Sequence, residues 1–238
     1  MDTIDKNSYL FFTLEEQIIH HLMLQTVSLK KNGLMYGKSG IALFFFEYGK
    51  YYHNPVFIDY GNELINSILS RINYKVSNDF STGLCGFGWC LEYLMYRKFI
   101  NCSHNSICIK IDKCVMKNDV RRFDDLSLEI GIEGLLHYVM IRMHGTKERK
   151  QNKPFDSIFM NDIYGKLCTI SEDDISDDLK KLKLSFISFF EKGMYLYKPN
   201  LSFLIDNTIV NSEKDYLLEN LGLSNGLSGK LLQSIYYF

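Results

Sequence analysis

The chain has 238 residues, of which 46% are apolar and 23% charged, the composition of an ordinary globular protein. Its 27 basic and 28 acidic residues give a net charge of -1, so charge directs it neither to nucleic acid nor to an anionic membrane. The N-terminus lacks the basic-then-apolar order of a signal peptide, and the longest apolar run, residues 41–46, is far below the ~20 residues of a membrane span. We therefore expect a single cytoplasmic domain over residues 1–238, with no membrane span, no nucleic-acid partner and reduced cysteines.

Amphipathic helices are expected at intervals along the chain. The first covers residues 14–29, where Thr13 and Glu16 have the spacing of a capping box. The second covers residues 56–72, whose apolar side chains recur every three to four positions. Each of these helices should bury one face and expose the other. Two weaker candidates for the same type of helix are residues 155–167 and 201–221.

Glycine motifs alternate with these segments, and each motif precedes a run that is apolar on nearly every side. The runs after the first two motifs are IALFFFEY and WCLEYLMY. A helix that is apolar all round is buried, so the sequence predicts inner helices within an outer amphipathic layer. A glycine in a helix costs roughly 1 kcal/mol relative to alanine, so repeated glycines at helix starts indicate close backbone packing, or a cavity rimmed by backbone N–H groups. The structural glycines are Gly37, Gly40, Gly86, Gly88, Gly131, Gly134, Gly226 and Gly229.

The last glycine of each motif defines a period. Gly40, Gly88 and Gly134 are separated by 48 and 46 residues, and Gly229 follows Gly134 after 95, about twice this interval. The spacing predicts a further repeat without glycines near residue 181, with a helix over residues 175–190. The sequence therefore indicates about five helical hairpins, one in each repeat.

Four stretches resemble the lanthionine synthetase C-like family, especially its compact members of the Bacteroidetes type. They are GLMYGKSGIALFFF (33–46), GLCGFGWCLEYL (83–94), LSLEIGIEGLLHYV (126–139) and GLSNGLSG (222–229). The resemblance implies an all-α fold, an α/α toroid in which the starts of the inner helices open onto a central site. About five hairpins are predicted where the family has seven, so the ring need not be complete. The resemblance also implies a role in ribosomal peptide modification, with a precursor peptide or other modification enzymes as partners.

Active members of this family are lyase-class cyclases that bind zinc through a Cys, a Cys-His pair and a water. The metal activates a peptide thiolate, which adds to a dehydrated residue to close a thioether ring. This sequence has no Cys-His-Gly motif, so thioether cyclisation is doubtful and no metal ligand is assigned. Cys85 and Cys90 adjoin a glycine motif, but their spacing straddles a helix start. Cys90 also lies in an apolar run, where a thiol packs as a small hydrophobe.

Three residues are candidates for catalysis. Glu133 lies within one glycine motif and Glu92 follows another. Carboxylates at the mouth of a cavity can act as acid and base. The alternative for an acid near a helix start is a favourable interaction with the helix dipole. His137 is the best-placed histidine, either as a site residue or as a hydrogen-bonded residue of the core.

Three further residues are candidates for substrate binding. Trp89 directly follows Gly88, so it either lines a peptide cleft or fills the centre of the fold. Glu129 and Tyr36 lie beside glycine motifs, and Glu129 is four residues before Glu133. Besides the cyclase, two functions therefore remain open. One is a zinc-free accessory protein that binds the precursor peptide, and the other, by analogy of fold alone, is a carbohydrate-active α/α toroid.

Overall fold

The structure is a computed structural model that describes residues 13–101, 104–205, 217 and 220–236. Across these residues it contains nine α-helices and no β-strand, which confirms the all-α prediction. None of these helices has the length and apolarity needed to cross a bilayer. The helices are α1 (Leu14–Ser28), α2 (Lys38–Tyr51), α3 (Pro55–Leu69), α4 (Leu84–Tyr96), α5 (Asn105–Val115), α6 (Ile132–Glu148), α7 (Ser157–Thr169), α8 (Asp177–Lys192) and α9 (Leu227–Ile235).

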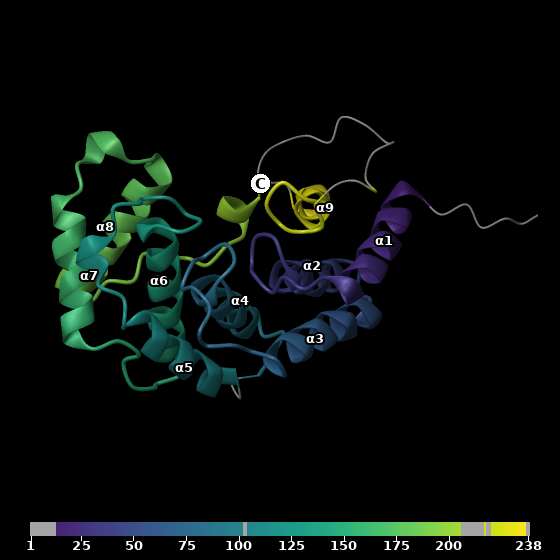
Figure 1. The fold of residues 1–238 in the computed structure, drawn as a ribbon, viewed down its shortest axis with the longest axis horizontal. Helices are drawn as coiled ribbons and strands as arrows, with labels where there is room; N and C mark the ends of the chain where they lie inside the picture. The colour runs from purple at the N-terminus through teal and green to yellow at the C-terminus, as the bar shows by residue number, and fades with distance from the viewer. Residues whose placement is uncertain (1–12, 102–103, 206–216, 218–219, 237–238) are drawn as a thin grey trace, which may run out of the picture.

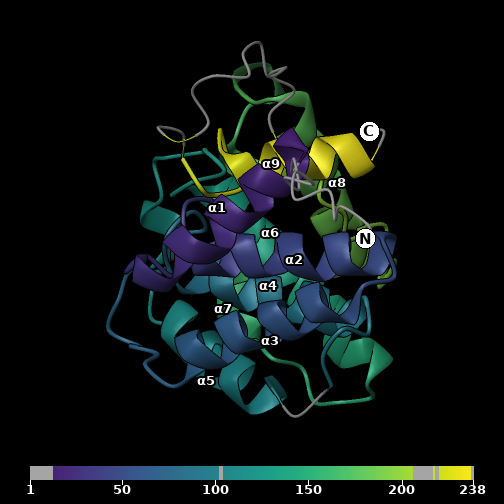
Figure 2. The ribbon, with the colours of Figure 1, turned by 90° about the vertical axis from the view of Figure 1, so that its right-hand side faces the viewer.

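Two kinds of helix alternate along the chain. In α2 and α4 almost every side chain is buried, whereas α3 and α5 bury only four residues each. The buried helices pack on one another, since α4 lies between α2 and α6, and α9 packs on the other side of α2. Figure 1 shows α7 and α8 at one end of this row and α1 at the other, and Figure 2 shows α1, α2 and α3 from that second end. The predicted contrast between buried and amphipathic helices is confirmed.

The predicted helix positions agree with the structure except near the C-terminus. The Thr13–Glu16 capping box begins α1, since each side chain accepts a hydrogen bond from the backbone N–H of the other residue. The helix expected near residue 181 is α8, which ends at Gly193 in the left-handed conformation that glycine adopts readily. The prediction of a helix over residues 201–221 is wrong at its start, where only a 3-10 turn, η4 (Ser202–Leu204), forms. Residues 206–216 and 218–219 lie outside the described residues.

Four glycine turns, residues 31–37, 77–83, 125–131 and 220–226, lead into α2, α4, α6 and α9. Each ends in a glycine that is the N-cap of its helix. In each, the first N–H of the helix donates to the carbonyl seven residues earlier, with N···O distances of 2.9, 3.0, 3.0 and 2.7 Å in chain order. The geometry therefore defines one structural unit repeated four times.

This geometry corrects the register of the repeat. A Cβ atom at Gly40, Gly86, Gly134 or Gly229 would overlap the carbonyl oxygen six residues earlier. Gly86 is therefore the counterpart of Gly40, and not Gly88, where a Cβ would instead meet the ring of Tyr138. The two glycines serve different contacts, which the sequence pattern alone could not separate.

The glycine turns are joined to one another by backbone hydrogen bonds. Leu223 N and Ser224 N donate to Met35 O at 2.8 and 3.1 Å, and Met35 N donates to Ser81 O at 3.0 Å. Ser81 N in turn donates to Glu129 O at 2.9 Å. The turns are thus linked in the order 220–226, 31–37, 77–83 and 125–131. Helix α8 also packs on α6, but its N-cap is Ser176 and no such turn precedes it.

Candidate functional site

The candidate site lies at the start of α6, where the described chain crosses from α8 to η4. We call residues 194–201 the crossing segment. Tyr197 of this segment contacts Trp89 of α4 and His137 of α6. Phe203, in η4 directly after the segment, contacts the same two residues. Two of the candidate site residues from the sequence, Trp89 and His137, are therefore neighbours.

A hydrogen-bonded aromatic cluster forms at this contact. Trp89 Nε1 donates to the Tyr197 hydroxyl at 3.0 Å, and that hydroxyl lies 3.1 Å from His137 Nδ1. The Tyr197 hydroxyl accepts from the indole N–H and can donate its own proton to Nδ1, in which case the histidine carries its proton on Nε2. Phe203 stacks on the other side of the imidazole, with ring centroids 3.7 Å apart and 7° between the planes.

Burial keeps this histidine neutral. The ring of His137 is enclosed by aromatic side chains, and burial lowers its pKa to about 3 because the imidazolium would lose its hydration. At neutral pH it is therefore a fixed hydrogen-bonding group of the aromatic cluster and not a proton carrier.

Glu133 lies one helical turn before His137, and its pKa is shifted toward neutrality instead of away from it. Burial raises its pKa to about 7, and the negative charge of Asp178 on α8 adds to this effect. A carboxyl group whose pKa is near neutrality can give and take a proton under physiological conditions. Of the candidate catalytic residues, Glu133 is the one that can exchange protons at neutral pH.

A cleft of about 500 Å³ opens beside the aromatic cluster, between α8 and the crossing segment. Its size is within the usual range for ligand sites. Its walls combine apolar side chains with hydroxyl, amide and charged groups of both signs. The lining residues are His137, Asp178, Lys181, Leu182, Ser185, Leu196, Tyr197, Lys198, Asn200, Ser202 and Phe203.

The crossing segment has the side-chain pattern of a β-strand without a partner strand. Leu196, Lys198 and Asn200 are exposed, whereas Tyr197 and Pro199 between them are buried. In the part of the chain that the structure describes, no backbone N–H of residues 195–201 donates to another backbone group. Such groups are normally paired in folded proteins, and among the described residues these have no backbone partner.

The remaining candidates from the sequence lie in two other places. The Tyr36 hydroxyl donates to Glu129 Oε1 at 2.6 Å, so these two residues join the first glycine turn to the third. Glu92 is buried and bonds to Arg142 and Arg149, with N–O distances of 2.7 and 2.8 Å. The structure therefore gives Glu92 two arginine partners and does not bring it to Glu133.

The described residues do not provide a site for zinc. Within the described residues, no three His, Cys, Asp or Glu side chains are grouped as metal ligands would be. Cys85 and Cys90 are buried in packing contacts, which raises the pKa of both thiols, and the Cys90 thiol lies 3.5 Å from Ser39 O. Neither is poised as a thiolate ligand, so we derive no chemical step through a metal.

Sequence analysis missed Tyr197 and Phe203, which complete the aromatic cluster. The sequence predicts no helix over residues 194–200. The alternation of exposed and buried side chains around Pro199 is the one signal there that could have marked an edge strand. The contacts of Phe203 depend on a 3-10 turn where a longer helix was predicted.

Comparison of the chain with protein-family models, with curated proteins and with solved structures gives no match in any of the three. What the site does must therefore be argued from its own residues.

Proposed function

We propose that this chain is a cytoplasmic, lanthionine synthetase C-like accessory protein that binds a precursor peptide in extended form, without zinc chemistry. The observation that carries the proposal is the crossing segment, which lines a cleft. It is an extended stretch with alternating exposed side chains, and from residue 195 on its N–H groups have no backbone partner among the described residues. An extended peptide that pairs with such an edge gains main-chain hydrogen bonds, while pockets for alternate side chains give specificity. The cleft offers such a pocket next to the edge.

The α/α toroid belongs to the same proposal. It is supported by the hydrogen-bonded order of the four glycine turns and by the packing of α8 on α6. In this arrangement α8 is the inner helix of the fifth hairpin. Because α8 has no glycine turn, it need not approach its neighbour as closely, which leaves space at its start for the cleft.

The chain's single tryptophan allows a direct test. Trp89 donates to Tyr197 of the crossing segment, so a peptide that pairs with this segment should change the tryptophan emission. The probe is a synthetic library of 12-residue peptides, titrated into the full chain. We expect library members that bind at micromolar concentration, and we expect N-methylation of alternate peptide bonds to abolish their binding because it removes the main-chain donors.

A matched pair of variants on α8 locates the binding. Ser185 lines the cleft, whereas Leu184 is exposed and lies outside it. Ser185→Arg should fill the cleft and weaken binding at least about tenfold, and Leu184→Arg should leave it unchanged. The proposal fails if no library peptide binds, if the N-methylated peptides bind equally well, or if both variants have the same effect.

A second candidate function, an acid–base hydrolase acting on carbohydrate, is favoured by Glu133 alone. Glycosidases use a carboxylic acid of raised pKa with a second carboxylate nearby, and Asp178 is close enough to Glu133 to raise its pKa. Hydrolysis of oligosaccharides between pH 5 and 8 that is lost in Glu133→Gln would support this function. Absence of hydrolysis by the wild-type chain would exclude it for the substrates tested.

A further inference from the structure

A second pocket is lined by residues of α1, α2 and α3 and of the segments beside them. Figures 1 and 2 show these three helices together, at the end of the molecule remote from α7 and α8. Its volume is about 420 Å³, close to that of the cleft at the crossing segment. We call it the Glu15 pocket. It is lined by Thr13, Glu15, Glu16, Ile19 and His20 of the α1 region and by Tyr48, Tyr52, Asn54 and Phe57 from α2, α3 and the turn between them.

Aromatic rings form one wall of the Glu15 pocket. The ring of Tyr48 lies 4.5 Å from that of Tyr52 and 5.0 Å from that of Phe57, measured between centroids. Tyr51 meets Tyr52 edge-on at 4.9 Å, and both of these rings are about half exposed. A cation held against such rings is attracted by the negative charge of their faces.

Two carboxylates, those of Glu15 and Glu16, also line the pocket. The hydroxyls of Tyr48 and Tyr52 both donate to Glu15 Oε1, at 2.8 and 3.2 Å. Burial and the Glu15 charge raise the pKa of both tyrosines, so they remain protonated donors. Neither Glu15 nor Glu16 forms an ion pair with a lysine or arginine of the described residues. Their two negative charges exceed the roughly half positive charge of the α1 N-terminus, which leaves the pocket negative.

We propose that the Glu15 pocket binds an arginine side chain of a partner polypeptide. A guanidinium is planar and carries N–H donors along its edge, so it can stack on the Tyr52 ring while it donates to Glu15. A lysine ammonium has no plane to stack and holds its hydration more tightly. The inference goes beyond the proposed function, since the Glu15 pocket is lined by residues 13–20 and 48–57, whereas the crossing segment covers residues 194–201.

The test is a titration of the isotope-labelled full chain with the peptide acetyl-Gly-Arg-Gly-amide, followed by NMR. Backbone amide shifts should change in residues 14–20 and 48–57 and should saturate with peptide concentration. The same peptide with citrulline, which has the shape of arginine without its charge, should bind about tenfold more weakly. A lysine peptide should bind more weakly than the arginine peptide.

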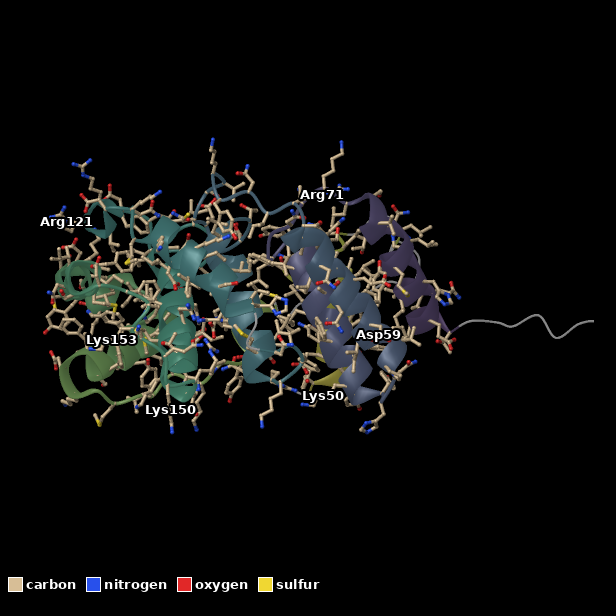
Figure 3. The ribbon with its side chains drawn as sticks, turned by 90° about the horizontal axis from the view of Figure 1, so that it is seen from below. Lys50, Asp59, Arg71, Arg121, Lys150 and Lys153 are labelled. Atoms are coloured by element: carbon tan, nitrogen blue, oxygen red, sulfur yellow. The ribbon has the colours of Figure 1, made fainter. Side chains whose placement is uncertain are left out.

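Two variants and a control assign the binding to this pocket. Glu15→Gln keeps an acceptor for the tyrosine hydroxyls but removes the charge, and Tyr52→Ala removes the exposed ring; each should weaken binding about five- to tenfold. Asp59→Asn removes one negative charge from α3 outside the pocket (Figure 3) and should leave the affinity unchanged. The amide spectrum and thermal unfolding of each variant verify that it is folded.

Several outcomes would overturn the proposal. Equal binding of the arginine and citrulline peptides would show that charge plays no part, and equal binding of the lysine peptide would remove the selectivity. Equal weakening by Glu15→Gln and Asp59→Asn would reveal general charge attraction instead of a site. Trp89 belongs to the aromatic cluster of the other site, so its emission should not respond to the arginine peptide. The two proposals can therefore fail separately.

Discussion

The two ends of α6 hold buried polar groups in opposite ways. Near the C-terminal end, Arg142 is 1% exposed and bonds to Glu92 and Asp112 at 2.7 and 2.9 Å. At the N-terminal end, His137 is also buried but neutral, and Glu133 lies close to the like charge of Asp178. We call the C-terminal end the matched end, because its buried charges are paired with opposite charges, and the N-terminal end the unmatched end, because Glu133 has no such partner among the described residues.

This difference distinguishes buried polar groups that stabilise the fold from those that are typical of functional sites. A buried ion pair with well-placed hydrogen bonds supports the fold, and removing one partner leaves an uncompensated charge. A carboxyl group whose pKa is raised by burial has no partner charge that stabilises its ionised form, and groups of this kind are concentrated at functional sites. The cleft and the crossing segment lie at the unmatched end.

The largest effect should come from the matched end. Arg142→Met leaves the Asp112 carboxylate buried with only the Tyr138 hydroxyl as a donor, at 2.6 Å, so we expect a loss of about 3–5 kcal/mol in the free energy of unfolding. The exposed Arg121 at the surface (Figure 3) pairs with Asp119 at 2.7 Å, and Arg121→Met should cost less than about 1 kcal/mol. Urea unfolding measures both, and equal losses would contradict the distinction between matched buried and exposed pairs.

The next effect concerns the glycine turn before the unmatched end. A Cβ at Gly134 would overlap Leu128 O and the Cβ of Phe80, so Gly134→Ala should destabilise the chain by about 2–3 kcal/mol. A Cβ at Gly165 on α7 would meet nothing within 4 Å, and Gly165→Ala should stabilise by up to about 1 kcal/mol. The opposite signs can be read from urea unfolding midpoints. Stabilisation by Gly134→Ala would disprove the close backbone contact.

A smaller loss is expected within the aromatic cluster. Tyr197→Phe removes the acceptor of the Trp89 N–H and the donor to His137, which costs about 1–3 kcal/mol. Tryptophan emission should shift with it, because the indole loses its partner. Tyr96→Phe, on an exposed residue of the same helix as Trp89, is the control and should change neither quantity.

Glu133 should make stability depend on pH. Its pKa in the folded chain is about 7, against an ordinary value of 4.5. The folded state therefore holds this proton more tightly, and the resulting stability is complete below pH 4.5 and lost as the pH rises through 7. We expect the wild type to lose about 1–2 kcal/mol relative to Glu133→Gln over this range, a value reduced for partial exposure. Parallel pH curves for the two proteins would show that Glu133 titrates normally.

The smallest effect should be seen at His137. With a pKa of about 3, its ring should show no change in NMR chemical shift from pH 8 down to pH 5. In Phe203→Ala, which removes the stacked ring, water gains access and the shift should begin to depend on pH. A titration of His137 near pH 6.5 in the wild type would mean that the ring is not enclosed.

Local patterns predicted much of this fold. The capping box of α1, the amphipathic helices and the buried runs after the glycines all depend on neighbours in sequence, and they appear where expected. The helix at residues 175–190 was expected from the spacing of the glycine motifs and from the sequence of the segment itself, and it corresponds to α8. The register of Gly86 was missed, because only a contact with Phe80 O distinguishes it from Gly88.

The candidate site was predicted only in part. Trp89 and His137 were selected for their positions after glycine motifs, and the structure brings them together. Their common partner, Tyr197, is 108 residues from Trp89 and 60 from His137, so no local pattern could assign it. The pairing of Glu92 with arginines is similarly a long-range property, since its partners lie 50 and 57 residues away.

The hydrogen bond from Leu223 N to Met35 O has a consequence for how the chain folds. The other links between turns join residues about 46–49 apart, whereas this one closes a loop of 188 residues. Two doublings of loop length add only about 1.2 kcal/mol of closure entropy, so the penalty at equilibrium is small. Kinetically, however, contacts between residues far apart in sequence form late. The α2, α4 and α6 turns should assemble first, and α9 should dock last on a surface that already exists.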